Sequence, residues 1–211
     1  MLISRANKFI FVHIYKNAGT SITNALLPYS NSKFENVANR ICSKYGIRHF
    51  DPLRYDENHG HMTAAQLITK ISRRTFDQYF SFAIVRNPWD WQASLYTFML
   101  KNTEHRQHEL IKSLGSFDKY IEWRCREEIR LQKNFIYDER GNQLVTFIGR
   151  YENLDQDFQY ICKTIGISTA LPKLNVSQSR PYQEYYNKQT VAMVADAFAP
   201  DIETFRYEFV W

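Results

Sequence analysis

The chain has 211 residues, of which 44% are hydrophobic and 16% aromatic, and its formal net charge is +5. This length and composition predict one globular domain over residues 1–211, and they exclude a low-complexity or disordered protein. The positive charge favours an anionic ligand or surface, although charge alone is explained better by a basic solvated face. The three cysteines lack metal-ligand spacing and indicate reduced thiols.

Apolar runs and helical spacings alternate along the chain. Continuous apolar runs predict buried parallel strands, and apolar residues at helical spacing predict helices. Strands are expected at residues 9–14, 79–85 and 144–151, with a candidate short strand at 47–50. Helices are expected at residues 20–27, 63–73, 88–100 and 117–134, between Asp155 and Gly166, and once or twice after Pro181. This alternation predicts a three-layer α/β fold, with a mostly parallel central sheet and a P-loop-like nucleotide-binding core flanked by helices.

The first candidate site follows the first strand. Lys16 lies in the loop, and Gly19 is expected to permit the tight turn into the next helix. Free N–H groups at a helix N-terminus, together with the macrodipole, favour an anion. The residues expected to surround this anion with Lys16 are Asn17, Ala18, Gly19, Thr20 and Ser21. The spacing differs from the G-x-x-x-x-G-K-[ST] of nucleoside triphosphatases, and an ordinary strand-to-helix turn explains these residues equally well.

The second candidate site follows the strand at residues 79–85. Arg86 closes this strand, so we expect it at the carboxyl edge of the sheet, where α/β folds bind ligands. Ser94 comes two helical turns later and is placed to share an anion with Arg86, whose fork suits a phosphate monoester. The alternative is that Arg86 pairs with Asp90 as a structural clasp. The first site makes that alternative weaker, and the two sites together suggest a nucleotide with phosphate at both ends.

These segments resemble the sulfotransferase superfamily, in the branch of carbohydrate and uronosyl sulfotransferases. That branch has F-V-H-x-x-K-x-A-G-T-S at its 5′-phosphosulfate loop, and residues 11–21 read FVHIYKNAGTS. It has R-N-P-x-x-R-x-x-S-x-Y at its 3′-phosphate site, and residues 86–96 read RNPWDWQASLY. Residues 147–154 and 171–175 are also similar, so the resemblance covers most of the chain. Tyr15 stands where the family often has Pro, and Trp91 stands where it commonly has Arg.

The resemblance implies in-line transfer of a sulfuryl group from 3′-phosphoadenosine-5′-phosphosulfate (PAPS) to a hydroxyl acceptor, with a carbohydrate or glycolipid favoured. Adenosine 3′,5′-bisphosphate is the implied product, and no metal is required. Lys16 would stabilise the leaving group, while residues 17–21 would hold the phosphosulfate. Arg86 and Ser94 would hold the 3′-phosphate.

His61 is the expected base, because residues 59–61 read HGH as in the uronosyl sulfotransferases and a histidine titrates in the useful range. The alternative for His61 is a helix cap or a polar surface turn. His13 is expected to be a hydrogen-bonded core residue rather than a catalyst. His59 is a candidate acceptor contact, although a plain surface position explains it better. The late loop at residues 175–180 is a candidate to complete the cofactor site.

Two other functions stay open at this point. A P-loop kinase would use a related anion loop, but the Gly-Lys-Ser/Thr ending is absent and the Arg86 site argues against it. A non-catalytic nucleotide-binding module is slightly favoured by Trp91 and opposed by Lys16 and His61. Lys and Arg are spread along the chain, so nucleic acid is not an expected partner. Without a signal peptide or an apolar stretch that could cross a bilayer, we expect a cytoplasmic bacterial protein, membrane-peripheral if the acceptor is a glycolipid.

Overall fold

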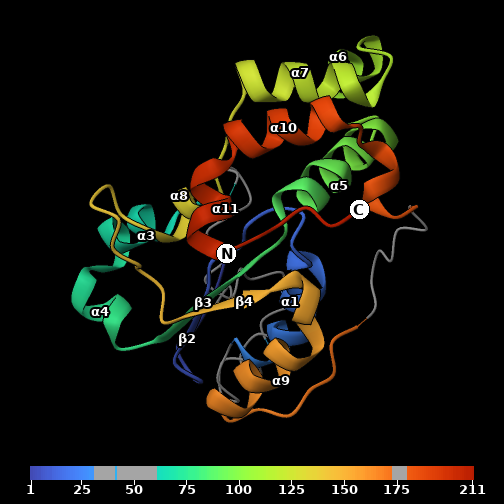
Figure 1. The fold of residues 1–211 in the computed structure, drawn as a ribbon. Coiled ribbons are helices and arrows are strands. Elements are labelled where there is room, and N and C mark those ends of the chain that lie inside the picture. The colour runs from blue at the N-terminus through green and yellow to red at the C-terminus, as the bar shows by residue number, and fades with distance from the viewer. Residues whose placement is uncertain (31–40, 42–60, 173–179) are drawn as a thin grey trace. The chain divides into compact units, whose positions relative to one another are not determined.

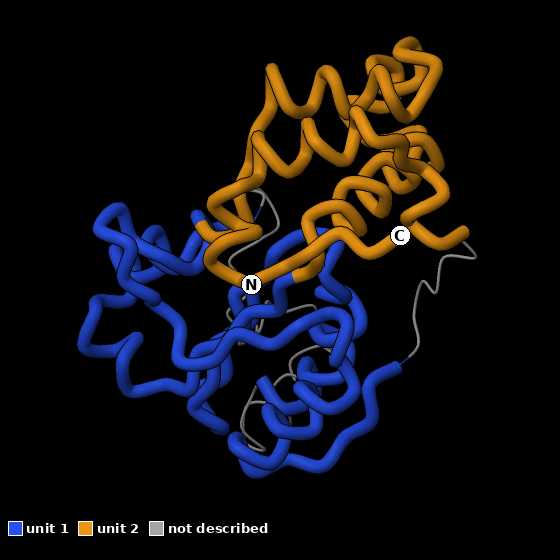
Figure 2. The backbone as a smooth tube through the Cα atoms, in the orientation of Figure 1, with its two compact units in different colours: residues 1–85, 134–175 blue, residues 86–133, 176–211 orange. Residues whose placement is uncertain are grey.

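The structure, a computed structural model, describes residues 1–30, 41, 61–172 and 180–211 (Figure 1). The expected short strand at 47–50, His59 and residues 175–179 lie outside these ranges and stay predictions. The chain divides into two compact units. Unit 1 contains residues 1–85 and 134–175, and unit 2 contains residues 86–133 and 176–211 (Figure 2). Neither unit is a continuous segment, and the single domain expected for residues 1–211 stays a prediction.

Unit 1 contains a four-stranded sheet with its strands in chain order: β1 (Leu2–Ser4), β2 (Phe9–Phe11), β3 (Phe80–Val85) and β4 (Phe147–Arg150). β1 is antiparallel to β2, while β2 and β4 both pair in parallel with β3. The mostly parallel sheet is therefore confirmed. β2 ends earlier than the expected strand at residues 9–14, although the Val12 N–H still donates to the Phe82 carbonyl at 2.8 Å.

Helices flank this sheet, as the sequence predicts. α1 (Gly19–Leu26) and α9 (Leu154–Thr164) pack against one face, and the short turns η1 (Leu27–Tyr29) and η2 (Tyr151–Asn153) adjoin them. The buried side chains of that face include Phe9, Phe11, Phe82 and Ile84. Because strand side chains alternate between faces, Ile10, Ala83 and Val85 belong to the other face, and they are buried too. Figure 1 shows α3 (Ala64–Ile71) and α4 (Arg73–Asp77) on the side of the strands away from α1 and α9.

Unit 2 is helical. Its helices are α5 (Pro88–Lys101), α6 (His108–Ser113), α7 (Phe117–Glu127), α10 (Lys188–Ala197) and α11 (Ala199–Phe205), with the turn η3 (Tyr182–Tyr185). The short helix α8 (Lys133–Ile136) crosses the boundary between the units. Within the described ranges, no helix is long and apolar enough to span a membrane.

Two expected helices are each broken in the structure. The helix expected at residues 63–73 ends at Ile71, because Ser72 has φ 71° and starts α4 as its N-cap. The helix expected at 117–134 ends at Glu127, because Glu128 leaves the helical region with φ −142° and ψ 59°. Both predicted helices were therefore too long. Apolar residues keep helical spacing across both breaks, so the sequence pattern does not reveal them.

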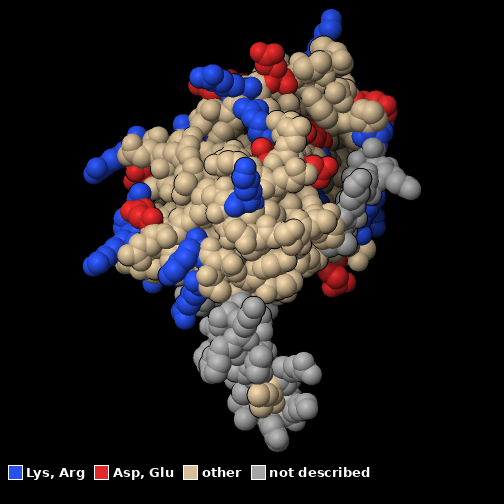
Figure 3. Space-filling model, turned by 90° about the horizontal axis from the view of Figure 1, so that it is seen from below, with Lys and Arg blue, Asp and Glu red and all other residues tan. Residues whose placement is uncertain are grey.

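Charged side chains on the surface are mixed in sign. On the face shown in Figure 3, Lys and Arg side chains lie mostly around a largely uncharged surface, several of them near one another on the left, with Asp and Glu side chains close by. That face carries no dense basic patch among the described residues. The expectation that nucleic acid is not a partner stays a prediction.

Candidate active site

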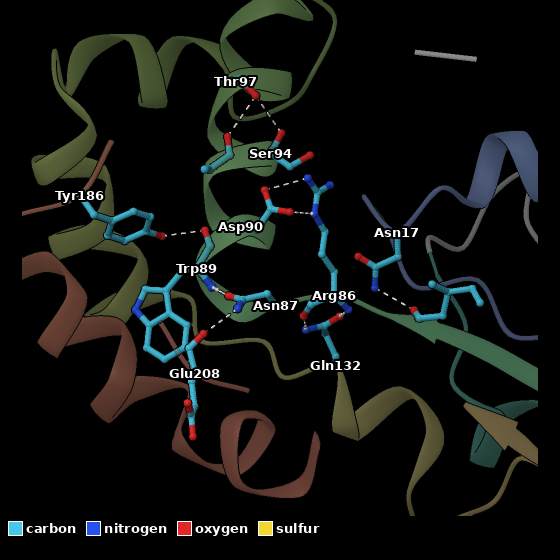
Figure 4. A network of polar contacts seen from close by, with 12 residues as sticks. Asn17, Arg86, Asn87, Trp89, Asp90, Ser94, Thr97, Gln132, Tyr186 and Glu208 are labelled. Carbon is cyan, nitrogen blue, oxygen red and sulfur yellow. Dashed lines mark hydrogen bonds and ion pairs between the residues drawn. The ribbon is translucent and has the colours of Figure 1, made fainter. Parts of the chain in front are cut away.

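The first candidate site is a tight loop between β2 and α1 in unit 1. Lys16 and Ala18 both adopt the left-handed backbone conformation, with φ 63° and 59°, which is uncommon for residues other than glycine. Asn17 lies between them with only 1% of its surface exposed. Its Nδ2 donates to the Ile84 carbonyl at 2.8 Å (Figure 4). Asn17 therefore ties the loop to the carboxyl end of β3, and turns of this kind can gather backbone N–H groups around an anion.

Gly19 is needed in this loop because the His13 ring lies close to its Cα. Its φ is not positive, so the left-handed residues Lys16 and Ala18 make the turn. A Cβ at Gly19 would lie 1.7 Å from Nε2 of His13, so the His13 ring occupies the space that a side chain would need. Sequence reasoning expected Gly19 to permit the turn and missed this contact.

The helix α1 begins at Gly19 without a side-chain cap. Its N-cap residue is Ala18, whose side chain cannot accept a hydrogen bond from the first turn. The first N–H groups of an α-helix have no acceptor within the helix, and the macrodipole places partial positive charge there. Thr20 is exposed, whereas Ser21 is buried. The start of α1 thus has the electrostatic character of an anion site, and Thr20 is exposed beside it.

His61 contacts the segment that leads into this loop. Its Nδ1 lies 3.0 Å from the His13 carbonyl oxygen. Its ring lies 4.5 Å from the His13 ring, edge-on, and 5.4 Å from the Tyr15 ring. A carbonyl only accepts hydrogen bonds, so Nδ1 carries the proton and Nε2 of the neutral imidazole holds the basic lone pair.

His61 does not cap the following helix. Thr63 caps α3 instead, because its side chain accepts from the Gln66 N–H and the Gln66 side chain accepts from the Thr63 N–H. The helix-cap alternative for His61 is therefore wrong.

His13 is held neutral in the structure. Burial, reinforced by the nearby His61, lowers the pKa of His13 from 6.5 to about 3. Its ring stacks on Phe11 at 5.6 Å between centroids. At neutral pH this imidazole is therefore an uncharged packing group between His61 and the start of α1. His13 is half-buried, so it lies at the margin of the core, whereas the sequence predicted a place within it.

The second candidate site lies in unit 2 and contains an ion pair. Arg86 Nε donates to Asp90 Oδ2 at 2.7 Å, and Nη2 donates to Oδ1 at 2.8 Å (Figure 4). This is the clasp that the sequence left as the weaker alternative. Ser94 follows Asp90 on the next turn of α5, and its carbonyl accepts from the Thr97 hydroxyl at 3.1 Å. The phosphate-binding role of Arg86 and Ser94 stays a prediction.

Sequence reasoning missed the residues that hold the Arg86 main chain. Gln132 Oε1 accepts from the Arg86 N–H at 2.9 Å, and Gln132 Nε2 donates to the Arg86 carbonyl at 2.8 Å. The N–H groups of Gln132 and Lys133 each donate to the Asp201 carboxylate at 2.8 Å. Burial raises the pKa of Asp201 to about 6. No sequence pattern marks these residues, because each contact joins segments that are far apart in the chain.

Trp91 is a core residue. Its side chain is 0% exposed and packs edge-on against Phe198, with the ring centroids 6.4 Å apart. The position where related sequences commonly carry Arg is therefore filled here by a buried indole.

The predicted site residues divide between the two units. Lys16, residues 17–21 and His61 belong to unit 1, where the structure brings His61 to the segment that leads into the loop. Arg86 and Ser94 belong to unit 2. Among the described residues, no cluster of three or more His, Cys, Asp or Glu side chains could hold a metal ion.

Comparisons with known proteins identify the class of protein. A sequence model of the Sulfotransferase family matches residues 1–208. The chain therefore belongs to the Sulfotransferase family, as its motifs predict. It is also 27% identical over 135 residues to an uncharacterized protein of Archaeoglobus fulgidus, an alignment that covers 58% of this chain and 98% of that protein. The crystal structure of mouse sulfotransferase SULT7A1 complexed with PAP is also similar, with a TM-score of 0.46 and 12% sequence identity. The alignment covers 95% of this chain and 86% of the mouse chain.

Proposed function

We propose that this protein transfers a sulfuryl group from PAPS to a hydroxyl group of a carbohydrate or glycolipid, with His61 as the base. Membership of the Sulfotransferase family supports sulfuryl transfer in general. The finer proposal depends on one observation, the hydrogen bond from His61 Nδ1 to the His13 carbonyl. This bond attaches the proposed base to the segment that ends at Lys16, so base and anion loop share one short stretch of main chain.

The residues of the first site suit the anionic donor. The uncapped start of α1 and the left-handed loop offer backbone N–H groups, and Lys16 adds a full positive charge. When bound, PAPS would supply the activated sulfuryl group and a phosphate at its 3′ position. Asp90 accepts two hydrogen bonds from Arg86. A guanidinium has five N–H donors, so Asp90 can orient Arg86 toward a 3′-phosphate without exhausting its donors.

The chain's own residues can handle the proton and the charge. His61 is held with Nε2 as its basic atom, where it would accept the proton of the acceptor hydroxyl. The resulting imidazolium would keep its Nδ1–H bond to the His13 carbonyl. Since the His13 ring stays neutral, with a pKa of about 3, this neighbouring ring would place no positive charge beside the protonated His61. Lys16 would stabilise the negative charge that develops on the leaving bisphosphate.

A transfer assay tests this proposal. We would incubate the protein with sulfur-35-labelled PAPS and a panel of purified polysaccharides and glycolipids, and count the label in each acceptor. A positioned base contributes about 10²- to 10⁴-fold, so His61→Ala should lower transfer by that factor while leaving nucleotide affinity unchanged. His105→Ala, which removes a histidine of unit 2, serves as the control and should keep full activity.

Other outcomes of the same assay would contradict the proposal. Undiminished transfer by His61→Ala would remove His61 from the mechanism. Phosphate transfer from ATP with Mg²⁺ would support a kinase, and tight nucleotide binding without transfer to any acceptor would support a non-catalytic module.

A further inference from the structure

The main chain at Arg86 is held by a side chain instead of a neighbouring strand. β3 ends at Val85, and its ladder with β4 ends at the same residue. Beyond this point the Gln132 side-chain amide pairs with both polar groups of the Arg86 main chain, at 2.9 and 2.8 Å. One side chain thereby replaces the two hydrogen bonds that a strand partner would supply.

Gln132 is fixed in turn by a buried carboxylate. Both oxygens of Asp201 accept main-chain N–H groups, one from Gln132 and one from Lys133, each at 2.8 Å. Gln132 and Asp201 are both 0% exposed. The direction of the Gln132 side chain is therefore set by hydrogen bonds at its main chain as well as at its amide.

We propose that Gln132 and Asp201 are positioning residues that hold Arg86 in the orientation in which it binds the 3′-phosphate of the donor. This inference rests on the proposed function. Gln132 fixes the main chain of Arg86, and Asp90 fixes its guanidinium, so the whole residue is held from its backbone to its charged end. Such preorganisation favours binding because little side-chain entropy is lost when the phosphate arrives.

The chemistry of the two residues supports a role beyond packing. Burying an amide and a carboxylate is less favourable than burying apolar side chains of the same volume. What the polar pair provides, and an apolar pair cannot, is a fixed direction for the main chain of Arg86. A purely structural role predicts loss of stability alone, whereas a positioning role predicts loss of discrimination between nucleotides with and without a 3′-phosphate.

The test measures that discrimination by calorimetry. We would titrate Gln132→Met with adenosine 3′,5′-bisphosphate and with 5′-AMP, because Met fills the volume of Gln but makes neither hydrogen bond. We expect affinity for the bisphosphate to fall about tenfold or more, with affinity for 5′-AMP unchanged. Asp201→Asn keeps the shape but accepts only one of the two N–H groups. It should also lower the ratio of bisphosphate affinity to 5′-AMP affinity. It also keeps the proposal testable if Gln132→Met does not fold.

Two controls separate this role from general destabilisation. Asn187→Ala removes the capping side chain of α10, elsewhere in unit 2, and should lower stability with no change in the ratio of the two affinities. In an Arg86→Ala background, Gln132→Met should have no further effect on bisphosphate affinity, because Gln132 acts through Arg86.

The failures of the two proposals are distinguishable. If Arg86→Ala leaves the preference for the bisphosphate intact, the 3′-phosphate site itself is wrong, and this inference falls with it. If Arg86→Ala abolishes the preference while Gln132→Met and Asp201→Asn retain it, only the positioning role is wrong. The positioning role would also be overturned if Asn187→Ala lowered the ratio of bisphosphate affinity to 5′-AMP affinity by as much as Gln132→Met does.

Discussion

The His13 ring occupies the space that a side chain at Gly19 would need. A Cβ at Gly19 would lie 1.7 Å from His13 Nε2, and the ring would have to move. Overpacking of this kind costs about 1–3 kcal/mol. We therefore expect Gly19→Ala to lower the free energy of unfolding by that amount, measured by urea denaturation, and to reduce transfer because the His13 carbonyl anchors His61.

Gly115 provides a matched control for this prediction. It has φ 75°, and nothing lies within 4 Å of a Cβ added there, so Gly115→Ala strains the main chain without a clash. His13→Ala should relieve the cost of Gly19→Ala and leave that of Gly115→Ala unchanged. If His13→Ala changed the stability cost of both glycine variants equally, the contact between Gly19 and His13 would be unimportant.

Single residues differ in how far the sequence could reveal them. Lys16 and Arg86 were proposed because each follows a predicted strand and lies in a family motif, and His61 was proposed from the resemblance alone; their roles stay predictions. Gln132 and Asp201 were missed because neither belongs to a motif, and their contacts arise only when distant segments meet. The Arg86–Asp90 ion pair was foreseen as an alternative and judged the weaker, because the first candidate site made a phosphate at Arg86 the favoured interpretation.

Among the elements, α5 depends on Asn87 at its start. The Asn87 side chain accepts from the Trp89 N–H at 3.1 Å and donates to the Glu208 carbonyl at 2.9 Å (Figure 4). Asn87 thus caps the helix and also holds the C-terminal segment. We expect Asn87→Ala to lower the free energy of unfolding by about 1–2 kcal/mol in urea denaturation, within the range of lost N-caps.

The isosteric variant Asn87→Asp separates these two roles. It keeps the acceptor for Trp89 and loses the donor to Glu208, so its stability should fall between those of the wild type and Asn87→Ala. Wild-type stability in Asn87→Ala would contradict both roles.

Elements with a strong apolar pattern were predictable, and those set by local main-chain geometry were not. The strands β2, β3 and β4 follow apolar runs, and α5 begins at Pro88 as expected. β1 was missed because three residues are too few to show a pattern. α6 was missed because its stretch is polar, and the breaks at Ser72 and Glu128 were missed because backbone conformation, not hydrophobicity, makes them.

At the scale of the whole molecule, two buried groups should give stability opposite dependences on pH. The pKa of His13 is lowered from 6.5 to about 3, so its contribution is present above pH 6.5 and is lost as the pH falls toward 3. The pKa of Asp201 is raised from 3.8 to about 6, so its contribution is present below pH 3.8 and is lost as the pH rises through 6. Each slope is about 1.4 kcal/mol per pH unit.

These slopes can be measured as differences from the wild type. Relative to wild type, His13→Gln should gain stability as the pH falls from 6 to 4, and Asp201→Asn should lose stability over the same range. Urea denaturation at a series of pH values gives both differences. Parallel pH profiles for a variant and the wild type would contradict the assigned shift of that residue.

The same experiment tests the expected single domain. His13 lies in unit 1 and Asp201 in unit 2, and the chain passes between the units more than once. If residues 1–211 unfold as one cooperative domain, both variants should shift one common transition. Two transitions, each shifted by only one of the variants, would contradict a single domain.

The central claim is that this protein binds a nucleotide with a 3′-phosphate as a sulfuryl donor. Its most direct test is calorimetric titration of the wild-type protein with adenosine 3′,5′-bisphosphate in EDTA, with 5′-AMP as the comparison. We predict a preference for the bisphosphate of about tenfold or more, lost in Arg86→Ala. Equal binding of the two nucleotides, or no binding by protein shown to be folded, would contradict the claim.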